Sequence, residues 1–479
     1  MKLLHKLWPK LKSNFPDILF FVFLLAIGSM LYINLGRDYL FDWDEGIYGE
    51  LGRQVVVGRH WLTNYWNGEP WFEKPPGISW VSALGISLLG PSALGARLFM
   101  PIIALYTLYM VYRLGRHLGG WTVGAMAAGI LATFNLFLGR TRGVNADMPL
   151  LASLVTTVVF LLEKRPVSWV ALSIVAGVWF KGLAGLLPVL IALPLFLTKS
   201  RQYWLLLIGY CLLLIIPWHL YSYFRYGSDF ATPYFYEQVV RRATAQIEFH
   251  FENRWYYFTY LYENLGLGVL LVAGLGAGIS LFTRRHFFLL WWVALPLALF
   301  TLAKTRLFWY ILPIYPALAL LIALAINSFN HTRTNRGVLG ILTVGILAQG
   351  IYSAGRSVEL TKTVVPAPDR LQVAMSLANS DRELFVLVPP SERLAEALLP
   401  NVARLGSSFR YGGMPSVVYY YHGPVQFFYN VDTFLASYST FGDLALVHVD
   451  DLAKLNFPYH ILTNTPTYVG LGKEVYADR

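Results

Sequence analysis

Three short blocks carry the side chains with which this chain could do chemistry. The first, F-D-W-D-E-G-I-Y-G-E at 41–50, places Asp42, Asp44 and Glu45 directly after an apolar stretch. A carboxylate here could take a proton from an acceptor hydroxyl, and general-base help of this kind contributes about 10²–10⁴-fold in rate. An acidic first turn of a helix, which the helix dipole favours, would explain the same block without any chemistry.

The second block is W-F-E-K-P-P-G at 71–77. Its two prolines predict a rigid extended turn before a helix, with Glu73 and Lys74 held in that turn. A lysine in this position suits a phosphate group as a point charge. The alternative is a lysine whose stem lies along the membrane surface while its charge stays in water.

The third block, G-R-T-R-G-V-N-A-D-M-P at 139–149, contains Arg140, Arg142 and Asp147. The planar guanidinium of arginine matches the oxygens of a phosphate. A simple ion pair between Arg142 and Asp147 would account for the block equally well.

Further charged residues interrupt later apolar stretches. Lys181, Lys304 and Arg306 would serve either as phosphate ligands or as anchors at helix ends. His250 lies close to Arg254, before the aromatic run W-Y-Y-F-T-Y. A site of one glutamate and one histidine is compatible with a divalent ion, but two ligands do not identify a metal.

The composition indicates that a membrane must position these residues. Only 14% of the 479 residues are charged, against roughly 25% in soluble proteins. Hydrophobic residues make up 56% of the chain, and the mean hydropathy is +0.50. So few charges cannot cover so much apolar surface, which excludes a soluble, disordered or coiled-coil protein. The single cysteine, Cys211, excludes an intrachain disulfide scaffold.

Apolar runs long enough to span a bilayer, roughly 17–25 residues, predict the transmembrane helices. These runs fall near 17–36, 94–115, 121–139, 146–163, 203–222, 264–283, 287–303, 307–327 and 336–354. The stretch 167–198, which Lys181 interrupts, is interpreted as two short spans, giving about eleven in all with a range of roughly 10–13. The shorter run 77–90 is interpreted as an interfacial or re-entrant helix.

Basic residues predict the orientation of these spans. Lysines precede the first span, and every even-numbered span ends in a basic pair, so we expect a cytoplasmic N-terminus. Residues 1–356 then form the transmembrane domain, with a first outer loop at 37–93. The polar tail 357–479 is expected to be a small extracytoplasmic mixed α/β domain. Its predicted strands are 383–389, 416–423, 445–449 and 459–462, and its predicted amphipathic helix is 391–399.

All the candidate residues then lie on one face of the membrane, which is the strongest indication of a site. Carboxylates and many cations at a lipid boundary suggest a substrate with an anionic, lipid-linked leaving group, such as a polyprenyl phosphate sugar. The reaction would be a displacement at the anomeric carbon, with cations stabilising the departing phosphate. The acceptor could be a lipid, a glycan or a protein.

Two other classes of function are less well supported. A transporter or flippase for lipid-linked sugars would place charges near the membrane midplane, whereas here they gather at one face. The basic residues are dispersed over short loops, with a net charge of +11, and form no stripe for nucleic acid.

The blocks D-E-x-x-Y-x-E at 44–50, F-E-K-P-P at 72–76 and R-x-x-x-x-D-M-P at 142–149 resemble the GT-C membrane glycosyltransferases. The nearest groups are the bacterial transferases of 4-amino-4-deoxy-L-arabinose to lipid A and the protein O-mannosyltransferases, and the resemblance covers about residues 15–325. It implies an inverting transfer from a polyprenyl phosphate donor, at the outer face of the bacterial inner (plasma) membrane.

The resemblance also implies roles for single residues. Asp44, with Glu45 beside it, matches the first-loop aspartate that acts as base or orients the acceptor, and Asp147 matches a second acidic position. Glu73 and His250 would lie near a divalent ion. The positions expected near the carrier phosphate are Lys74, Lys181, Arg254 and Tyr310; we add Arg142, Lys304 and Arg306 to this set for their charge. The sugar and the acceptor stay open.

Overall fold

The computed structural model describes residues 2–245, 252–328, 333–359, 366–378, 382–393 and 410–473. The chain divides into two compact units. The first, here called the helical unit, comprises residues 1–35, 97–224 and 252–363. The second, here called the mixed unit, comprises residues 36–96, 225–251 and 364–479. Residues 37–93 and the tail thus fall in the same unit.

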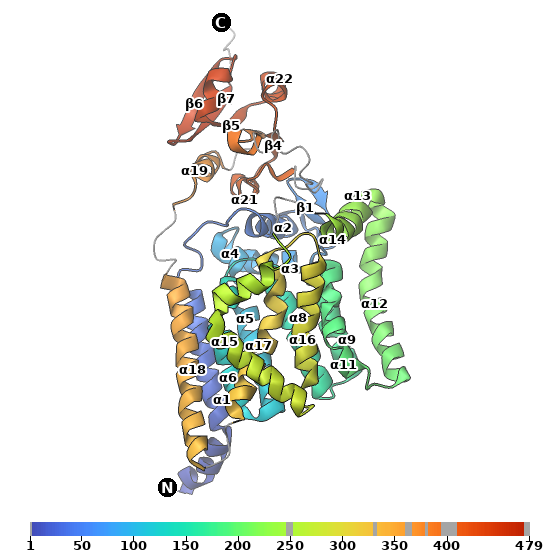
Figure 1. Ribbon diagram of the computed structural model, residues 1–479. Helices are drawn as coiled ribbons and strands as arrows, with labels where there is room; N and C mark the ends of the chain where they lie inside the picture. The colour runs from blue at the N-terminus through green and yellow to red at the C-terminus, as the bar shows by residue number, and fades with distance from the viewer. Residues whose placement is uncertain are drawn as a thin grey trace. The chain divides into compact units, whose positions relative to one another are not determined.

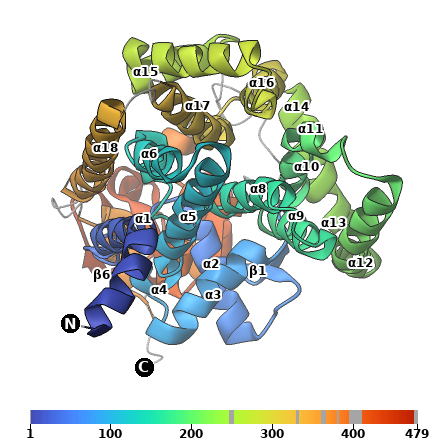
Figure 2. The ribbon, with the colours of Figure 1, turned by 90° about the horizontal axis from the view of Figure 1, so that it is seen from below.

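The helical unit is built from apolar helices (Figure 1). They are α1 (Lys2–Tyr32), α5 (Met100–Gly119), α6 (Trp121–Leu131), α7 (Asn135–Gly139), α8 (Asp147–Leu162), α9 (Val167–Lys181), α10 (Leu187–Ile191), α11 (Leu193–Phe196), α12 (Arg201–Tyr226), α15 (Tyr256–Phe282), α16 (Phe287–Leu302), α17 (Tyr315–Asn327) and α18 (Arg333–Glu359), with the 3₁₀ segments η1 (Gly182–Leu186) and η3 (Phe308–Ile314). Viewed from below, α5, α6 and α17 lie next to one another, and α1 lies beside α18 (Figure 2).

Within the described part of the chain, seven helical segments are long and apolar enough to cross a membrane. By length and composition they are Phe15–Tyr32, Ala93–Gly119, Val167–Ile191, Arg201–Tyr226, Tyr256–Phe282, Phe308–Asn327 and Arg336–Glu359. Of these, Val167–Ile191 is divided by a turn after Lys181. Three shorter apolar helices, α6, α8 and α16, fall in predicted spans, and α3 (Gly77–Leu89) falls where the interfacial helix is predicted. The predicted class, a polytopic α-helical membrane protein, is confirmed.

The break predicted at Lys181 is present. Gly182 follows α9 with a φ of 60°, and a Cβ on Gly185 would lie 2.2 Å from the carbonyl oxygen of Gly177. Residues eight apart in a continuous helix are about 12 Å apart along its axis. The chain therefore reverses direction directly after Lys181, which leaves this lysine at a turn.

The mixed unit contains the segment after the first span. Its helix α2 (Asp44–Gly58) packs on α3, and the hairpin of β1 (Asn64–Trp66) and β2 (Glu69–Trp71) precedes the second block. Asn67 and Gly68 both have positive φ, as a tight hairpin turn requires. The same unit includes the short helices α4 (Ala93–Arg97), α13 (Ser228–Ala231) and α14 (Arg242–Thr244) and the π-helix η2 (Thr232–Arg241).

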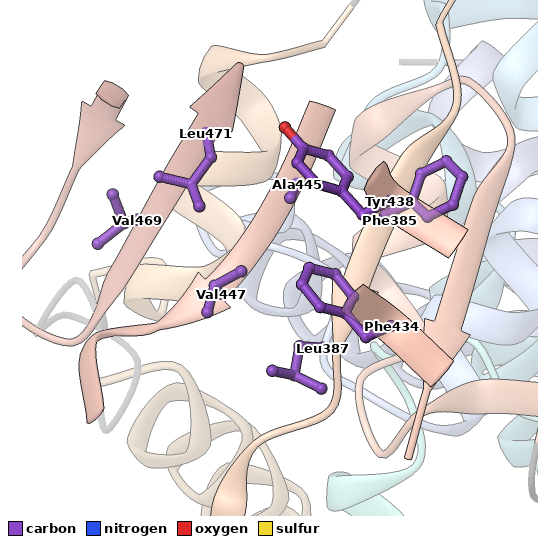
Figure 3. Packing of buried hydrophobic residues seen from close by; sticks show 8 residues of the cluster. All are labelled: Phe385, Leu387, Phe434, Tyr438, Ala445, Val447, Val469 and Leu471. Atoms are coloured by element: carbon purple, nitrogen blue, oxygen red, sulfur yellow. The ribbon is translucent and has the colours of Figure 1, made fainter. Parts of the chain in front are cut away.

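The tail forms a five-stranded sheet in the order β4-β3-β5-β7-β6. The strands are β3 (Leu384–Leu387), β4 (Val425–Phe428), β5 (Leu444–His448), β6 (Tyr459–Asn464) and β7 (Tyr468–Lys473), and β3 pairs in parallel with β4 and β5. The helical segments of the tail are α19 (Asp369–Ser376), α21 (Ser416–Tyr421), α22 (Val431–Phe441) and the 3₁₀ turn η5 (Val449–Lys454). Side chains of α22 pack on one face of the sheet around Phe385 and Val447 (Figure 3).

One predicted strand of the tail is wrong. Residues 416–423 were expected to be a strand, but Ser416–Tyr421 is the helix α21. Five of its six residues are buried, so the apolar residues repeat with neither the period of a strand nor that of a helix. The strand was predicted because the segment is rich in aromatic and β-branched residues. The predicted helix 391–399 lies largely outside the described residues.

Candidate functional site

In the helical unit, Lys181 forms an ion pair with Asp147. The Asn145 side chain accepts hydrogen bonds from the backbone N–H groups of Asp147 and Met148, at 3.1 and 2.9 Å, and so caps the start of α8. Asp147 thus lies at a helix N-terminus and Lys181 at a helix C-terminus, where the helix dipole favours each charge. The two side chains are only 7% and 16% exposed.

Aromatic rings at the start of η3 hold two cations. Lys181 Nζ lies 5.7 Å from the ring centre of Tyr310, and the guanidinium carbon of Arg140 lies 4.3 Å from the ring centre of Trp309. Cation–π contacts of this kind orient a charge without neutralising it. The structure therefore brings together three predicted residues, Asp147, Lys181 and Tyr310. Arg140, which the predicted phosphate set lacks, lies on the ring next in sequence to Tyr310.

The other predicted cations of this unit have different surroundings. Arg142 donates to the carbonyl oxygen of Ile33 at 2.7 Å, at the end of α1. The buried Arg306 donates to the carbonyls of Glu252 and Thr301, at 2.7 and 2.8 Å, and so holds the chain before α15 against the end of α16. Lys304 and Arg254 are exposed.

In the mixed unit, Asp42 and Glu45 of the first block accept hydrogen bonds from nearby groups. Asp42 accepts hydrogen bonds from the backbone N–H and the hydroxyl of Ser416 and pairs with Arg370. Glu45 accepts a hydrogen bond from the backbone N–H of Phe41 at 3.1 Å. Asp44 is the half-buried first residue of α2. Asp44 is the acid of this block for which the family resemblance implies a chemical role.

The backbone before Asp44 is strained. Trp43 has a φ of 69° and a ψ of −121°, a conformation rare for residues other than glycine. Such residues cost about 1–3 kcal/mol and cluster at functional sites. The strain directly before Asp44 is a reason to single out this residue.

The second block forms its own network. Glu73 accepts hydrogen bonds from the Tyr411 hydroxyl at 2.7 Å and from the Gln238 amide at 2.8 Å. Lys74 Nζ lies 5.4 Å from the ring centre of Tyr48 and 5.8 Å from that of Trp71. Burial, together with the nearby Glu73 carboxylate, raises the pKa of Tyr411 well above its usual range, so its hydroxyl stays protonated. Tyr411 and Gln238 belong to no motif, and no pattern in the sequence indicates either residue.

The candidate metal site is described only in part. His250 lies outside the described residues, so its distance from Glu73 is not defined. Among the residues that the structure does describe, no three side chains of His, Cys, Asp or Glu gather into a group that could hold a metal ion.

The fold is that of a polytopic helical membrane protein with charged groups at helix ends, and comparisons with known proteins refine this class. A family model described as dolichyl-phosphate-mannose-protein mannosyltransferase matches residues 73–221, a stretch that contains Glu73, Lys74, Asp147 and Lys181. The solved structure of ArnT from Cupriavidus metallidurans bound to undecaprenyl phosphate has a TM-score of 0.74 at 16% identity, covering 95% of this chain and 98% of ArnT. The oligosaccharyltransferase AglB from Archaeoglobus fulgidus has a TM-score of 0.53 at 11% identity, covering 92% and 70%. The predicted resemblance in fold to the GT-C glycosyltransferases is thus confirmed.

Curated relatives point in the same direction. The undecaprenyl phosphate-alpha-4-amino-4-deoxy-L-arabinose arabinosyl transferase of Pseudomonas paraeruginosa is 30% identical over 328 residues, which are 63% of this chain and 58% of the relative. The enzyme of the same name from Pseudomonas aeruginosa is 30% identical over 326 residues, with the same coverage. The chain thus spans a little under three fifths of the length of these relatives.

Proposed function

We propose that this chain is an inverting glycosyltransferase that uses a polyprenyl phosphate-linked sugar donor. The observation that carries the proposal is the buried ion pair of Lys181 and Asp147, since it lies within the stretch that matches the mannosyltransferase model. A lysine ammonium binds phosphate as a point charge, so Lys181 would take a phosphate oxygen as its partner in place of the Asp147 carboxylate. The acceptor is a lipid, a glycan or a protein.

In the proposed reaction, an acceptor oxygen attacks the anomeric carbon of the sugar. The bond from that carbon to the phosphate oxygen breaks, and its electron pair leaves with the polyprenyl phosphate. Asp44 takes the proton of the acceptor hydroxyl. Glu45 holds the backbone N–H of Phe41, and Asp147 holds the ammonium group of Lys181. The developing phosphate charge is stabilised by Tyr310 and the basic residues Lys74, Lys181, Arg142, Arg254, Lys304 and Arg306.

A divalent ion held by Glu73 and His250 is part of this proposal. Glu73 suits such an ion, because an ionised carboxylate has about four lone-pair positions and the two hydrogen bonds from Tyr411 and Gln238 use two of them. The ion would supply positive charge near the leaving phosphate.

We also propose the orientation of the chain. The protein would cross the bacterial inner membrane many times, with the N-terminus in the cytoplasm and the tail outside. A donor carried by a lipid suits that face, where nucleotide sugars are not available.

The test is transfer by the purified chain in detergent, with the product identified by mass spectrometry. The donors are undecaprenyl phosphate carrying 4-amino-4-deoxy-L-arabinose and polyprenyl phosphate mannose, and the acceptors are lipid A and peptides. We expect Asp44→Asn to lower the rate at least about 100-fold, as loss of a general base does. The control is Asp432→Asn, which removes an exposed carboxylate in α22.

Two results would count against the proposal. A wild-type chain that transfers neither sugar, or an Asp44→Asn variant as active as the control, would contradict it. Movement of the donor across a proteoliposome membrane without any product in detergent would instead favour a flippase.

A further inference from the structure

The tail reaches the second block through one buried side chain. Tyr411 is 2% exposed, and its hydroxyl donates to Glu73 Oε1 at 2.7 Å. The same hydroxyl accepts a hydrogen bond from Trp71 Nε1 at 2.5 Å. Trp71 is the last residue of β2, two positions before Glu73. One hydroxyl therefore contacts both ends of the short segment that leads into the Glu-Lys pair.

The second oxygen of Glu73 has its own donor. Gln238 of η2 donates from Nε2 to Glu73 Oε2 at 2.8 Å, and Arg242 in turn donates from Nε to Gln238 Oε1 at 3.0 Å. The plane of the carboxylate is thus set by two neutral donors from two separate parts of the chain. Both donors are neutral groups, so neither forms an ion pair with Glu73.

Lys74 is linked to the same group of side chains. Its ammonium lies 5.8 Å from the ring centre of Trp71, and Tyr411 fixes the Nε1 edge of that ring. The aromatic rings of Trp66 and Trp43 meet Tyr411 edge-on, at 4.8 and 6.2 Å between ring centres. The phenol ring is therefore packed in place, and its hydroxyl has one orientation.

We propose that Tyr411 is a positioning residue, through which the C-terminal domain orients Glu73 and the Trp71 ring beside Lys74. This inference rests on the proposed glycosyl transfer. It gives the tail a defined part in that reaction. Without the hydroxyl, Glu73 loses one of its two donors, and the buried indole N–H of Trp71 loses its acceptor.

The variant Tyr411→Phe tests this role, because it keeps the ring and removes the hydroxyl. Tyr421→Phe is the matched control: Tyr421 is fully buried in the same domain, and its hydroxyl donates to the Arg382 carbonyl at 2.6 Å. We expect Tyr411→Phe to lower kcat/KM by about 10–100-fold, the usual loss when a partner of a functional ligand is removed. We expect the control to keep wild-type activity and to lower the thermal midpoint to a similar extent.

A double-mutant cycle shows whether Tyr411 acts through Glu73. In a Glu73→Gln background, Tyr411→Phe should cause less than a twofold further loss, because the carboxylate that it orients is already gone. Full multiplication of the two losses would overturn the proposal. So would a Tyr411→Phe variant as active as the control.

Hydrogen exchange separates this inference from the proposed function. The amides of residues 66–76 should exchange at least several-fold faster in Tyr411→Phe than in wild type or in Tyr421→Phe. Unchanged exchange in that segment would overturn the positioning role, whatever the activity. Faster exchange in a chain that transfers no sugar would leave the positioning role intact and reject the glycosyltransferase.

Discussion

The ion pair of Lys181 and Asp147 contributes to the stability of the fold and, in the proposed reaction, to activity. Removing one partner of a buried ion pair leaves an unpaired charge and typically costs about 3–5 kcal/mol, whereas neutralising both costs far less. We therefore expect Lys181→Met to lower the thermal midpoint in detergent strongly. Adding Asp147→Asn to that variant should recover most of the lost stability.

Measuring the activity of the double variant distinguishes a structural role of the ion pair from a role in the reaction. The double variant should stay at least about 100-fold less active than wild type despite its recovered midpoint, because it has no cation there for the phosphate. A double variant that is both stable and active would show that the pair only holds α8 and α9 together.

His422, the residue that caps the end of α21, makes the stability of the fold depend on pH. Burial, and then the nearby Arg53, lower the pKa of His422, so its ring takes up a proton at a lower pH in the folded protein than in the unfolded chain. As the pH falls, the unfolded chain takes up a proton near its reference pKa of about 6.5, before the folded chain does. Stability therefore falls as the pH drops through that range.

The variant His422→Asn removes this titration. Asparagine tolerates the φ of 68° that His422 adopts, so the backbone is not strained by the change. We expect the thermal midpoint to fall less between pH 7.5 and 5.5 in the variant than in wild type, working from the reference pKa of about 6.5. Equal slopes would mean that other groups dominate this pH range.

At the scale of elements, α15 offers a matched pair of glycines. A Cβ on Gly276 would lie 2.1 Å from the carbonyl oxygen of Leu321 on α17, whereas a Cβ on Gly278 meets nothing within 4 Å. Small residues at such crossings let helix backbones approach closely in a membrane. We expect Gly276→Ala to lower the thermal midpoint and the yield of folded protein, while Gly278→Ala leaves both unchanged or slightly raised. A similar effect of the two changes would refute the close packing of α15 on α17.

Some features of these elements could be predicted from the sequence and others could not. The reversal after Lys181 was predictable, because a charge followed by Gly182 interrupts an otherwise apolar run. The helix α21 was not, because Val417, Val418, Tyr419 and Tyr421 are all buried and erase the periodicity. The stacking of Arg140 on Trp309 joins residues far apart in sequence, and the motif around Arg140 carries no sign of its aromatic partner.

For the whole molecule, the three blocks predicted the kind of chemistry but not which side chains hold the site residues in position. Lys181 and Asp147 were both predicted site residues, yet their pairing depends on the packing of α8 against α9. Tyr411 lies more than three hundred residues from Glu73, so nothing local relates the two side chains. A sequence shows which charged residues lie at a membrane surface, where their burial costs free energy. It does not show the neutral donors that orient them.

The orientation of the whole chain in the membrane can be tested by labelling, because the chain has a single cysteine. In a Cys211→Ser background, Ser439→Cys in α22 places a thiol at an exposed position of the tail, and Thr283→Cys places one at the exposed end of α15. The distribution of lysine and arginine puts the first outside and the second in the cytoplasm. In spheroplasts, a membrane-impermeant maleimide should label Ser439→Cys at once and Thr283→Cys only after lysis. The reverse pattern would place the tail in the cytoplasm, and with it Glu73 and Asp44, where a polyprenyl phosphate donor would no longer be needed to supply the sugar.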